Sequence, residues 1–224
     1  MVERRPEMRV ADLGCGTGEL TREMHHALKA AETLGVDNSP SMLFKSRSLG
    51  EDKLRFEQGD IESFAASHPF DLIFSNAALH WLADHETVIT RLAGFLSPHG
   101  QLAIQIPAND DHPSHAIAAE VAIEMGEPSR PDHLLTPEQY ASLLHALGLR
   151  RQNVRLQVYG HQLDSANGVV EWVRGALLTD YEVRLGTRFP KFLEEYTRRV
   201  VAKLGTRTPY FYTYKRILIW GSLM

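Results

Sequence analysis

A glycine-rich turn near the start of the chain is the feature best suited to hold a ligand. The segment "VADLGCGTGELT", residues 10–21, places glycine at positions 14, 16 and 18, and an acid, Asp12, lies two residues before the first of them. Glycine lets a backbone approach a ligand closely, and the helix expected after the turn offers N–H groups at its first turn. Turns of this kind hold several different cofactors, so other residues must decide between them.

Phosphate-bearing cofactors fit this turn poorly. The dinucleotide fingerprint requires a small residue three positions after its second glycine, and that position, counted from Gly16, is Glu19. A carboxylate there repels a pyrophosphate. The Gly-Lys-Ser/Thr ending of a P-loop does not follow the turn either. Two alternatives to a phosphate-free cofactor stay open, an NAD-dependent oxidoreductase of the same fold and a purely structural strand-to-helix bend.

Polar residues end the next three predicted strands. Asp37 ends the second strand, Asp60 the third and Asn76 the fourth. Ligands bind at the carboxyl edge of a parallel sheet, so we expect these side chains and Asp12 to line one crevice. Asp37 suits two ribose hydroxyls, Asp60 an adenine amino group and Asp12 a cationic ammonium, a set that S-adenosylmethionine presents without phosphates. Helix caps at Asp37 and Asp60 and a turn at Asn76 are the alternatives.

A parallel sheet must position these residues. Strand-like and helix-like runs alternate through the first two thirds of the chain, which predicts parallel strands with right-handed crossovers. We expect an α/β, Rossmann-like fold with a mixed seven-stranded sheet whose last strand is antiparallel. Helices from the segments after the fifth and sixth strands would form a cap. The predicted strands are residues 8–14, 32–37, 53–60, 70–76, 101–107, 153–163 and 210–221, and helices are expected to start at caps Asp84 and Thr136.

Composition predicts one globular domain. The chain has 224 residues, 43% hydrophobic and 23% charged, with a net charge of −4, which gives no basic footprint for nucleic acid. No apolar run reaches the roughly 18 residues of a membrane span, and the start lacks the apolar region of a signal peptide. The chain has one cysteine, which is typical of a protein from a reducing compartment. We expect a cytoplasmic protein without nucleic-acid or membrane partners, and no oligomeric state is predicted.

Several segments resemble a known family. "VADLGCGTGELT", "LGVDNSP", "FEQGDIESF" and "FDLIFSNAALHWL" resemble successive motifs of class I S-adenosylmethionine-dependent methyltransferases. "FDLIFSNAALHWLADH", "LSPHGQLAIQIPAND", "VVEWVRGALL" and "YFYTYKRILI" resemble trans-aconitate 2-methyltransferases. The resemblance covers nearly the whole chain. It implies methyl transfer from S-adenosylmethionine to a small carboxylic acid, trans-aconitate or a similar polycarboxylate, giving a methyl ester. The alternatives are another small-molecule acceptor, or a cofactor-binding protein with little activity.

The resemblance also implies a cofactor site. Backbone around Gly14 and Gly16 would hold the methionine part, Asp37 the ribose and Asp60 the adenine amino group, with Ile61 over the ring and Asn76 beside the transferring methyl. The predicted cofactor residues are Asp12, Gly14, Cys15, Gly16, Asp37, Asn38, Asp60, Ile61 and Asn76. Residues 1–109 would form this core, and residues 110–224 the helical cap segments and remaining core strands of the same structural domain. Family members usually carry a further N-terminal helix, whereas about seven residues precede the first strand here. Either the sequence is truncated or the site is more open, and the alternative of little activity rests on this difference.

The chemistry of the methyl acceptor determines which further protein side chains the reaction needs. A carboxylate is already ionised near pH 7, so no general base is required and no catalytic residue is predicted with certainty. Asn76, His80 and Trp81 are expected to position the reactants. A polycarboxylate needs cationic partners, and arginine forks suit it best. The predicted substrate-binding residues are Trp81, Trp172, Arg174, Tyr212 and Arg216. An exposed surface position is the alternative for the arginines, and a packed position for the tryptophans.

One histidine cluster invites a metal interpretation. "DDHPSH", residues 110–115, holds His112 and His115 three positions apart, but Pro113 interrupts the helical spacing and no further ligand is obvious. A solvated loop is the preferred interpretation, and no metal is predicted.

Overall fold

The computed structural model of the chain describes residues 2–128, 133–175 and 177–223. These residues divide into two compact units. The first contains residues 2–107, 133–157 and 216–223, and the second contains residues 108–128, 158–175 and 177–215. The first boundary follows residue 107. It lies two residues before the predicted boundary between the cofactor-binding core, residues 1–109, and the later segments. That all of these segments form one structural domain stays a prediction.

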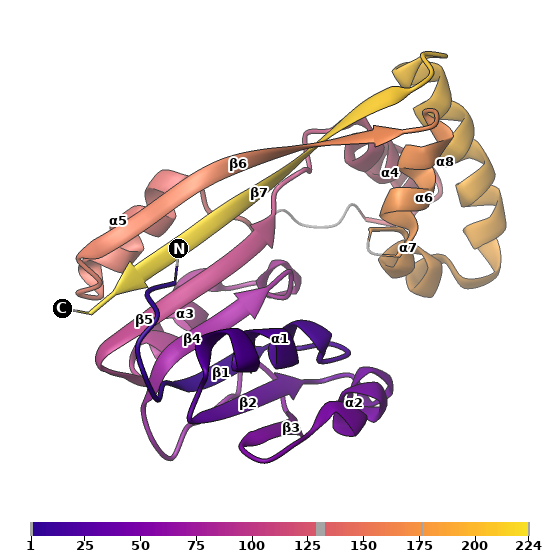
Figure 1. Cartoon of the computed structure of the whole chain (residues 1–224). Helices are drawn as coiled ribbons and strands as arrows, with labels where there is room; N and C mark the ends of the chain where they lie inside the picture. The colour runs from indigo at the N-terminus through magenta and orange to yellow at the C-terminus, as the bar shows by residue number, and fades with distance from the viewer. Residues whose placement is uncertain (1, 129–132, 176, 224) are drawn as a thin grey trace. The chain divides into compact units, whose positions relative to one another are not determined.

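A seven-stranded sheet runs through the described residues in the order β3-β2-β1-β4-β5-β7-β6 (Figure 1). Strands β1 to β5 pair in parallel, and β7 pairs antiparallel with β5. The predicted mixed sheet with an antiparallel last strand is therefore confirmed. The strands are β1 (Arg9–Leu13), β2 (Glu32–Asp37), β3 (Leu54–Gln58), β4 (Phe70–Asn76), β5 (Leu96–Pro107), β6 (Arg151–Leu163) and β7 (Tyr210–Ser222).

Helices follow the strands as the alternation predicts, except that the described residues between β3 and β4 form no helix. The first unit contains α1 (Glu19–Leu28), α2 (Pro40–Ser46), η1 (Arg47–Leu49), η2 (Leu79–Trp81), α3 (His85–Ala93) and α5 (Pro137–Ala146). The second contains α4 (Pro113–Glu124), α6 (Asn167–Arg174), α7 (Leu177–Leu185), η3 (Gly186–Arg188) and α8 (Phe189–Leu204). Asp84 caps α3 by accepting from the N–H of Thr87 at 2.9 Å, and Thr136 forms a capping box with Gln139. Within the residues described, none of these helices has the length and apolarity needed to cross a membrane.

Strand β5 is longer than predicted. It begins at Leu96 rather than at Gln101, so the predicted start of this strand is wrong by five residues. Ser, Pro and Gly favour a turn locally, but Phe70 pairs with Leu96 and Leu72 pairs with Gln101 across a register shift. The shift absorbs the irregular stretch as a bulge, and pairing with β4 overrides the local preference.

Each unit has its own core. In the first, Val10, Leu72 and Ala103 from neighbouring strands pack with Leu28 of α1 and with Trp220. Side chains at alternate positions of a strand share one face of a sheet. This face, which α1 covers, therefore continues to the carboxyl ends of β1, β4 and β5.

The second unit is held by aromatic stacking. Tyr181 and Phe192 lie with ring centroids 5.0 Å apart, and Phe192 and Tyr196 lie 5.8 Å apart. All three side chains are almost fully buried, so this stack joins α7 to α8.

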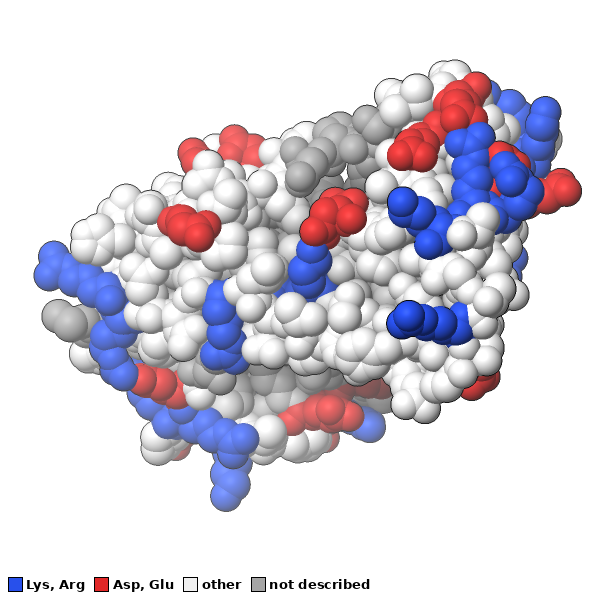
Figure 2. All heavy atoms as spheres, turned by 90° about the horizontal axis from the view of Figure 1, so that it is seen from above, with Lys and Arg blue, Asp and Glu red and all other residues white. Residues whose placement is uncertain are grey.

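Charged groups of both signs are mixed on the surface. Figure 2 shows Lys and Arg side chains interspersed with Asp and Glu on the face that it draws. On α8, Arg198 and Arg199 both pair with Glu195, and Arg199 also pairs with Glu124. Neighbouring carboxylates therefore balance the charges of these two arginines.

Candidate functional site

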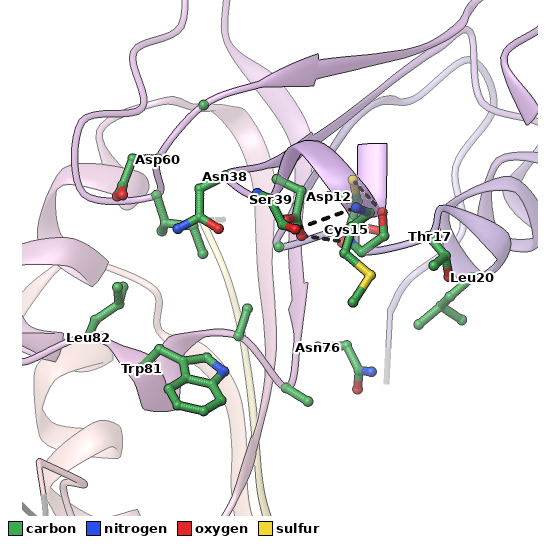
Figure 3. Close-up of a pocket in the computed structure, with 18 of the residues that line it drawn as sticks. Asp12, Cys15, Thr17, Leu20, Asn38, Ser39, Asp60, Asn76, Trp81 and Leu82 are labelled. Atoms are coloured by element: carbon green, nitrogen blue, oxygen red, sulfur yellow. Dashed lines mark hydrogen bonds between the residues drawn. The ribbon is translucent and has the colours of Figure 1, made fainter. Parts of the chain in front are cut away.

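A crevice of about 750 Å³ lies in the first unit at the carboxyl ends of β1, β2 and β4. In Figure 3, Asp60 and Asn38 lie on one side of it, Trp81 lies below them, and Thr17 and Leu20 lie at the other end. The structure brings together in this crevice all the residues predicted for the cofactor: Asp12, Gly14, Cys15, Gly16, Asp37, Asn38, Asp60, Ile61 and Asn76. Glu19, which argued against a pyrophosphate, lines it as well.

The glycine turn has two different requirements for glycine. Gly14 has φ of +78°, and a Cβ there would lie 2.2 Å from the Cβ of Ala78 in the loop after β4. Gly16 has φ of +56°, and a Cβ there would meet nothing within 4 Å. Gly14 therefore allows two loops to approach each other. Gly16 leaves an open cradle on the crevice wall, which is the kind of space that a ligand fills.

Asp37 fastens this turn to the end of β2. Its carboxylate accepts the backbone N–H of Gly16 at 2.8 Å and that of Ser39 at 2.9 Å. A carboxylate offers about four acceptor positions, so it has capacity for two further donors, as a ribose diol requires. Ser39, not Asp37, is the N-cap of α2. The helix-cap alternative for Asp37 is therefore wrong.

Asp12 is a buried acid beneath the turn. Its carboxylate accepts the hydroxyl of Thr21 at 2.6 Å. Burial, with the nearby charge of Asp37, raises the pKa of Asp12 to about 7, although the hydrogen bond from Thr21 opposes the rise. Burial and the charges of Asp12 and Asp37 also raise the pKa of the Cys15 thiol to about 12. Cys15 is therefore an inert thiol at neutral pH, as expected of a small filler.

Hydrogen bonds from α3 hold the segment after β3 in place. Asp60 accepts the backbone N–H of Glu62 at 2.7 Å, which closes a turn two residues on. Arg91 of α3 donates to the carbonyl oxygens of Ile61 and Phe64. These bonds hold Asp60 and the buried Ile61 side chain against the crevice. No α-helix of the described chain starts at Asp60, so the helix-cap alternative is wrong here too.

The loop after β4 forms another wall. Asn76 ends β4, and the residue with positive φ is Ala77, at 53°. The sharp turn is therefore at Ala77 rather than at Asn76. Trp81 lines the crevice and is 50% exposed, and the His80 ring packs against it in a tilted arrangement with 4.9 Å between ring centroids. A large aromatic side chain so exposed at a crevice is available to a ligand.

Two predicted substrate residues lie together in the second unit. Trp172 is 41% exposed and packs against His161 at 4.4 Å and Tyr212 at 5.9 Å between ring centroids. Tyr212 is fully buried, and its hydroxyl accepts the Asn109 side-chain N–H at 3.1 Å. Burial raises the pKa of Tyr212 to about 12, so it stays protonated at neutral pH. The sequence did not single out Asn109 as a functional residue.

The two arginines predicted to bind a carboxylate substrate, Arg174 and Arg216, have different hydrogen-bond partners. Arg174 and Glu171 form an exposed ion pair at 3.2 Å. Other ion pairs in the second unit include Arg184–Asp180, Arg188–Glu127, Arg198–Glu195, Arg199–Glu124 and Lys215–Asp111. Arg216 donates to the side-chain amide oxygen of Gln105 at 3.2 Å, within the first unit. Exposed pairs such as Arg174–Glu171 contribute little energy and separate easily.

The histidine cluster serves a helix start. His112 is the N-cap residue of α4, and its Nδ1 accepts the backbone N–H of Ser114 at 3.2 Å. Among the residues that the structure describes, no three His, Cys, Asp or Glu side chains gather closely enough to hold a metal ion.

The chain resembles methyltransferases over most of its length. Residues 4–148 match the family described as "Methyltransferase domain". The trans-aconitate 2-methyltransferase of Deinococcus radiodurans is 40% identical over 230 residues, which cover 97% of this chain and 88% of that protein. The enzyme of the same name from Variovorax paradoxus is 39% identical, covering 89% of this chain and 80% of that protein. This chain belongs to the trans-aconitate 2-methyltransferase family.

The fold agrees with this membership. A solved S-adenosylmethionine dependent methyltransferase from Mesorhizobium loti superposes with a TM-score of 0.55 and 20% identity, covering 99% of this chain and 93% of that one. The seven-stranded sheet is thus the class I methyltransferase fold. The chain is a methyltransferase, and S-adenosylmethionine is its cofactor.

Proposed function

We propose that the chain transfers the methyl group of S-adenosylmethionine to a carboxylate of trans-aconitate or a similar polycarboxylate, forming a methyl ester. Curated relatives named trans-aconitate 2-methyltransferase, at 36–40% identity, support this acceptor. A cytoplasmic location is part of the proposal and agrees with the single, unpaired Cys15.

The acidic lining of the crevice is the observation that carries this proposal. Asp12, Glu19, Asp37 and Asp60 all line it, which disfavours a pyrophosphate and favours a cationic ligand rich in hydroxyl and amino donors. Asp12 then faces the ammonium group, Asp37 the ribose and Asp60 the adenine amino group. The other assignments are the backbone of Gly14, Cys15 and Gly16 to the methionine part, Asn38 to the ribose, Ile61 to the ring and Asn76 to the methyl group.

The transfer itself needs alignment. The bound cofactor supplies a methyl group on a sulfonium, and a substrate carboxylate oxygen forms the new C–O bond while the C–S electron pair returns to sulfur. An ionised carboxylate loses no proton in this step, so the residues around the crevice act by positioning and by excluding water. Asn76, His80 and Trp81 are the positioning residues that we propose. Trp172, Arg174 and Tyr212 of the second unit stay predicted acceptor residues, together with Trp81 and Arg216 of the first.

Two measurements on the purified chain test the proposal. Calorimetry should show saturable binding of S-adenosylhomocysteine and none of NADH, and the reverse result would contradict the cofactor site. Transfer of a radiolabelled methyl group should then be measured over a panel of di- and tricarboxylates. We expect base-labile label, as an ester gives, on trans-aconitate. Cofactor binding with label only on non-carboxylate acceptors would contradict the acceptor.

A further inference from the structure

One buried side chain beside the crevice has a donor that the fold does not use. Gln105 of β5 is 7% exposed, and its side-chain Nε2 has no hydrogen-bond partner in the described chain. A buried amide donor without a partner destabilises a folded protein. The orientation of this amide is fixed, because Arg216 donates to Oε1 at 3.2 Å. A flipped amide would place two N–H donors against each other.

Gln105 lies directly behind two residues that line the cofactor crevice. It pairs with Asn76 in the parallel register of β4 and β5, so the two side chains lie next to each other on one face of the sheet. The backbone carbonyl oxygen of Gln105 accepts the backbone N–H of Ala77 at 3.0 Å. Asn76 and Ala77 both line the crevice. Because Pro107 pairs with Arg216 across β5 and β7, Arg216 lies on the same face as Gln105.

We propose that Gln105 is a specificity-determining residue that binds a carboxylate of the acceptor next to the methyl-transfer position. The inference rests on the proposed function. The unused Nε2–H donates to a carboxylate oxygen, and the Arg216 guanidinium adds positive charge at the same place. Donation from Arg216 to Oε1 also polarises the amide, which makes its N–H a better donor. A monocarboxylate, having only the carboxylate that is methylated, would lack this second contact.

A second glutamine in β5 provides a matched control. Gln101 is 1% exposed and lies on the same face, four residues earlier. Both ends of its amide have partners: Oε1 accepts from the backbone N–H of Glu3 and the indole N–H of Trp220, and Nε2 donates to the carbonyl oxygen of Glu3. Gln101 is thus a structural glutamine, whereas Gln105 has a donor to spare.

Gln105→Leu and Gln101→Leu should therefore give opposite results. For Gln105→Leu we expect the KM for the polycarboxylate to rise at least tenfold, with the Kd of S-adenosylhomocysteine within twofold and thermal stability unchanged or higher. For Gln101→Leu we expect lower thermal stability and a KM within twofold of wild type. An unchanged KM in Gln105→Leu would overturn the inference, as would an equal rise in KM and in the cofactor Kd.

The introduction of a negative charge gives a second test that keeps the fold. Gln105→Glu retains a partner for Arg216 but places a carboxylate where the substrate carboxylate would bind, and we expect a KM at least a hundredfold higher. A KM within twofold of wild type would contradict carboxylate binding at this position. Failure of the proposed function looks different, because wild type itself would then methylate no polycarboxylate in the panel.

Discussion

The hydroxyl of Thr21 donates a hydrogen bond of 2.6 Å to the buried carboxylate of Asp12, and this bond joins the first turn of α1 to β1. Thr21 is fully buried and Asp12 is 2% exposed. The bond is the main contact that favours the ionised form of Asp12 against burial. Asp12 therefore gains or loses its charge close to neutral pH, and the charge of this part of the crevice changes with it.

Cofactor binding should depend on pH through Asp12. Below pH 7 the carboxyl is protonated and no longer attracts an ammonium group, so the Kd of S-adenosylmethionine should rise as pH falls, by up to about tenfold per unit. Calorimetry between pH 5.5 and 7.5, a range chosen to stay near or below about 7.7 where amino groups titrate, measures this slope. Asp12→Asn should flatten the profile, and Thr21→Val should move its midpoint above pH 7. An equal slope in Asp12→Asn would assign the dependence to another group.

The same acid should limit the stability of the cofactor-free protein. The pKa of Asp12 rises from 3.8 to about 7 on folding, so the folded state binds more protons between these values and stability falls as pH rises through them. About three pKa units correspond to at most about 4 kcal/mol. Asp12→Asn keeps an oxygen for Thr21 and should therefore raise the free energy of unfolding at pH 8 while changing it little at pH 4. Urea unfolding at both values measures this; equal changes at both would contradict it.

Much of the site was predictable because the carboxyl ends of parallel strands meet at one edge. Asp12, Asp37, Asp60 and Asn76 are far apart in sequence, yet all of them line the crevice. Their positions at or near strand ends follow from local patterns: β4 is Phe70–Asn76, as its apolar run predicts. Asp60 is predicted to end the third strand, but β3 ends two residues earlier, at Gln58. The fold class followed from the same alternation of strands and helices.

Other features depend on pairing between distant strands, which local sequence does not reveal. Leu96 joins β5 because β4 accommodates a register shift, although Ser97 and Pro98 favour a turn. Gln105 looks like an ordinary polar residue in an apolar strand, and only its bond to Arg216 of β7 and its place beside Asn76 show an unused donor. The expectations for Trp172 and Arg174 rested on family resemblance rather than on spacing.

The two glycines of the turn should fail in different ways. Gly14→Ala combines a positive φ with a clash against Ala78, and about 3 kcal/mol or more of stability should be lost. Because the clashing atom is the Cβ of Ala78, adding Ala78→Gly should restore part of the loss, as a double-mutant cycle would show. Gly16→Ala meets open space, so it should cost only about 1 kcal/mol of stability but weaken S-adenosylhomocysteine binding at least tenfold. Purely additive effects for the Gly14 and Ala78 pair would contradict the clash.

Trp81 should report ligand binding by its fluorescence. It is one of three tryptophans, lines the crevice and is 50% exposed, whereas Trp220 is 8% exposed and its indole N–H donates to Gln101 at 3.0 Å in the core. A ligand in the crevice changes the solvent contact of Trp81 and leaves that of Trp220 as it is. S-adenosylhomocysteine should therefore change the emission of wild type and of Trp220→Phe, but not that of Trp81→Phe. If the change survives in Trp81→Phe while calorimetry shows unaltered binding, the ligand does not contact this wall of the crevice.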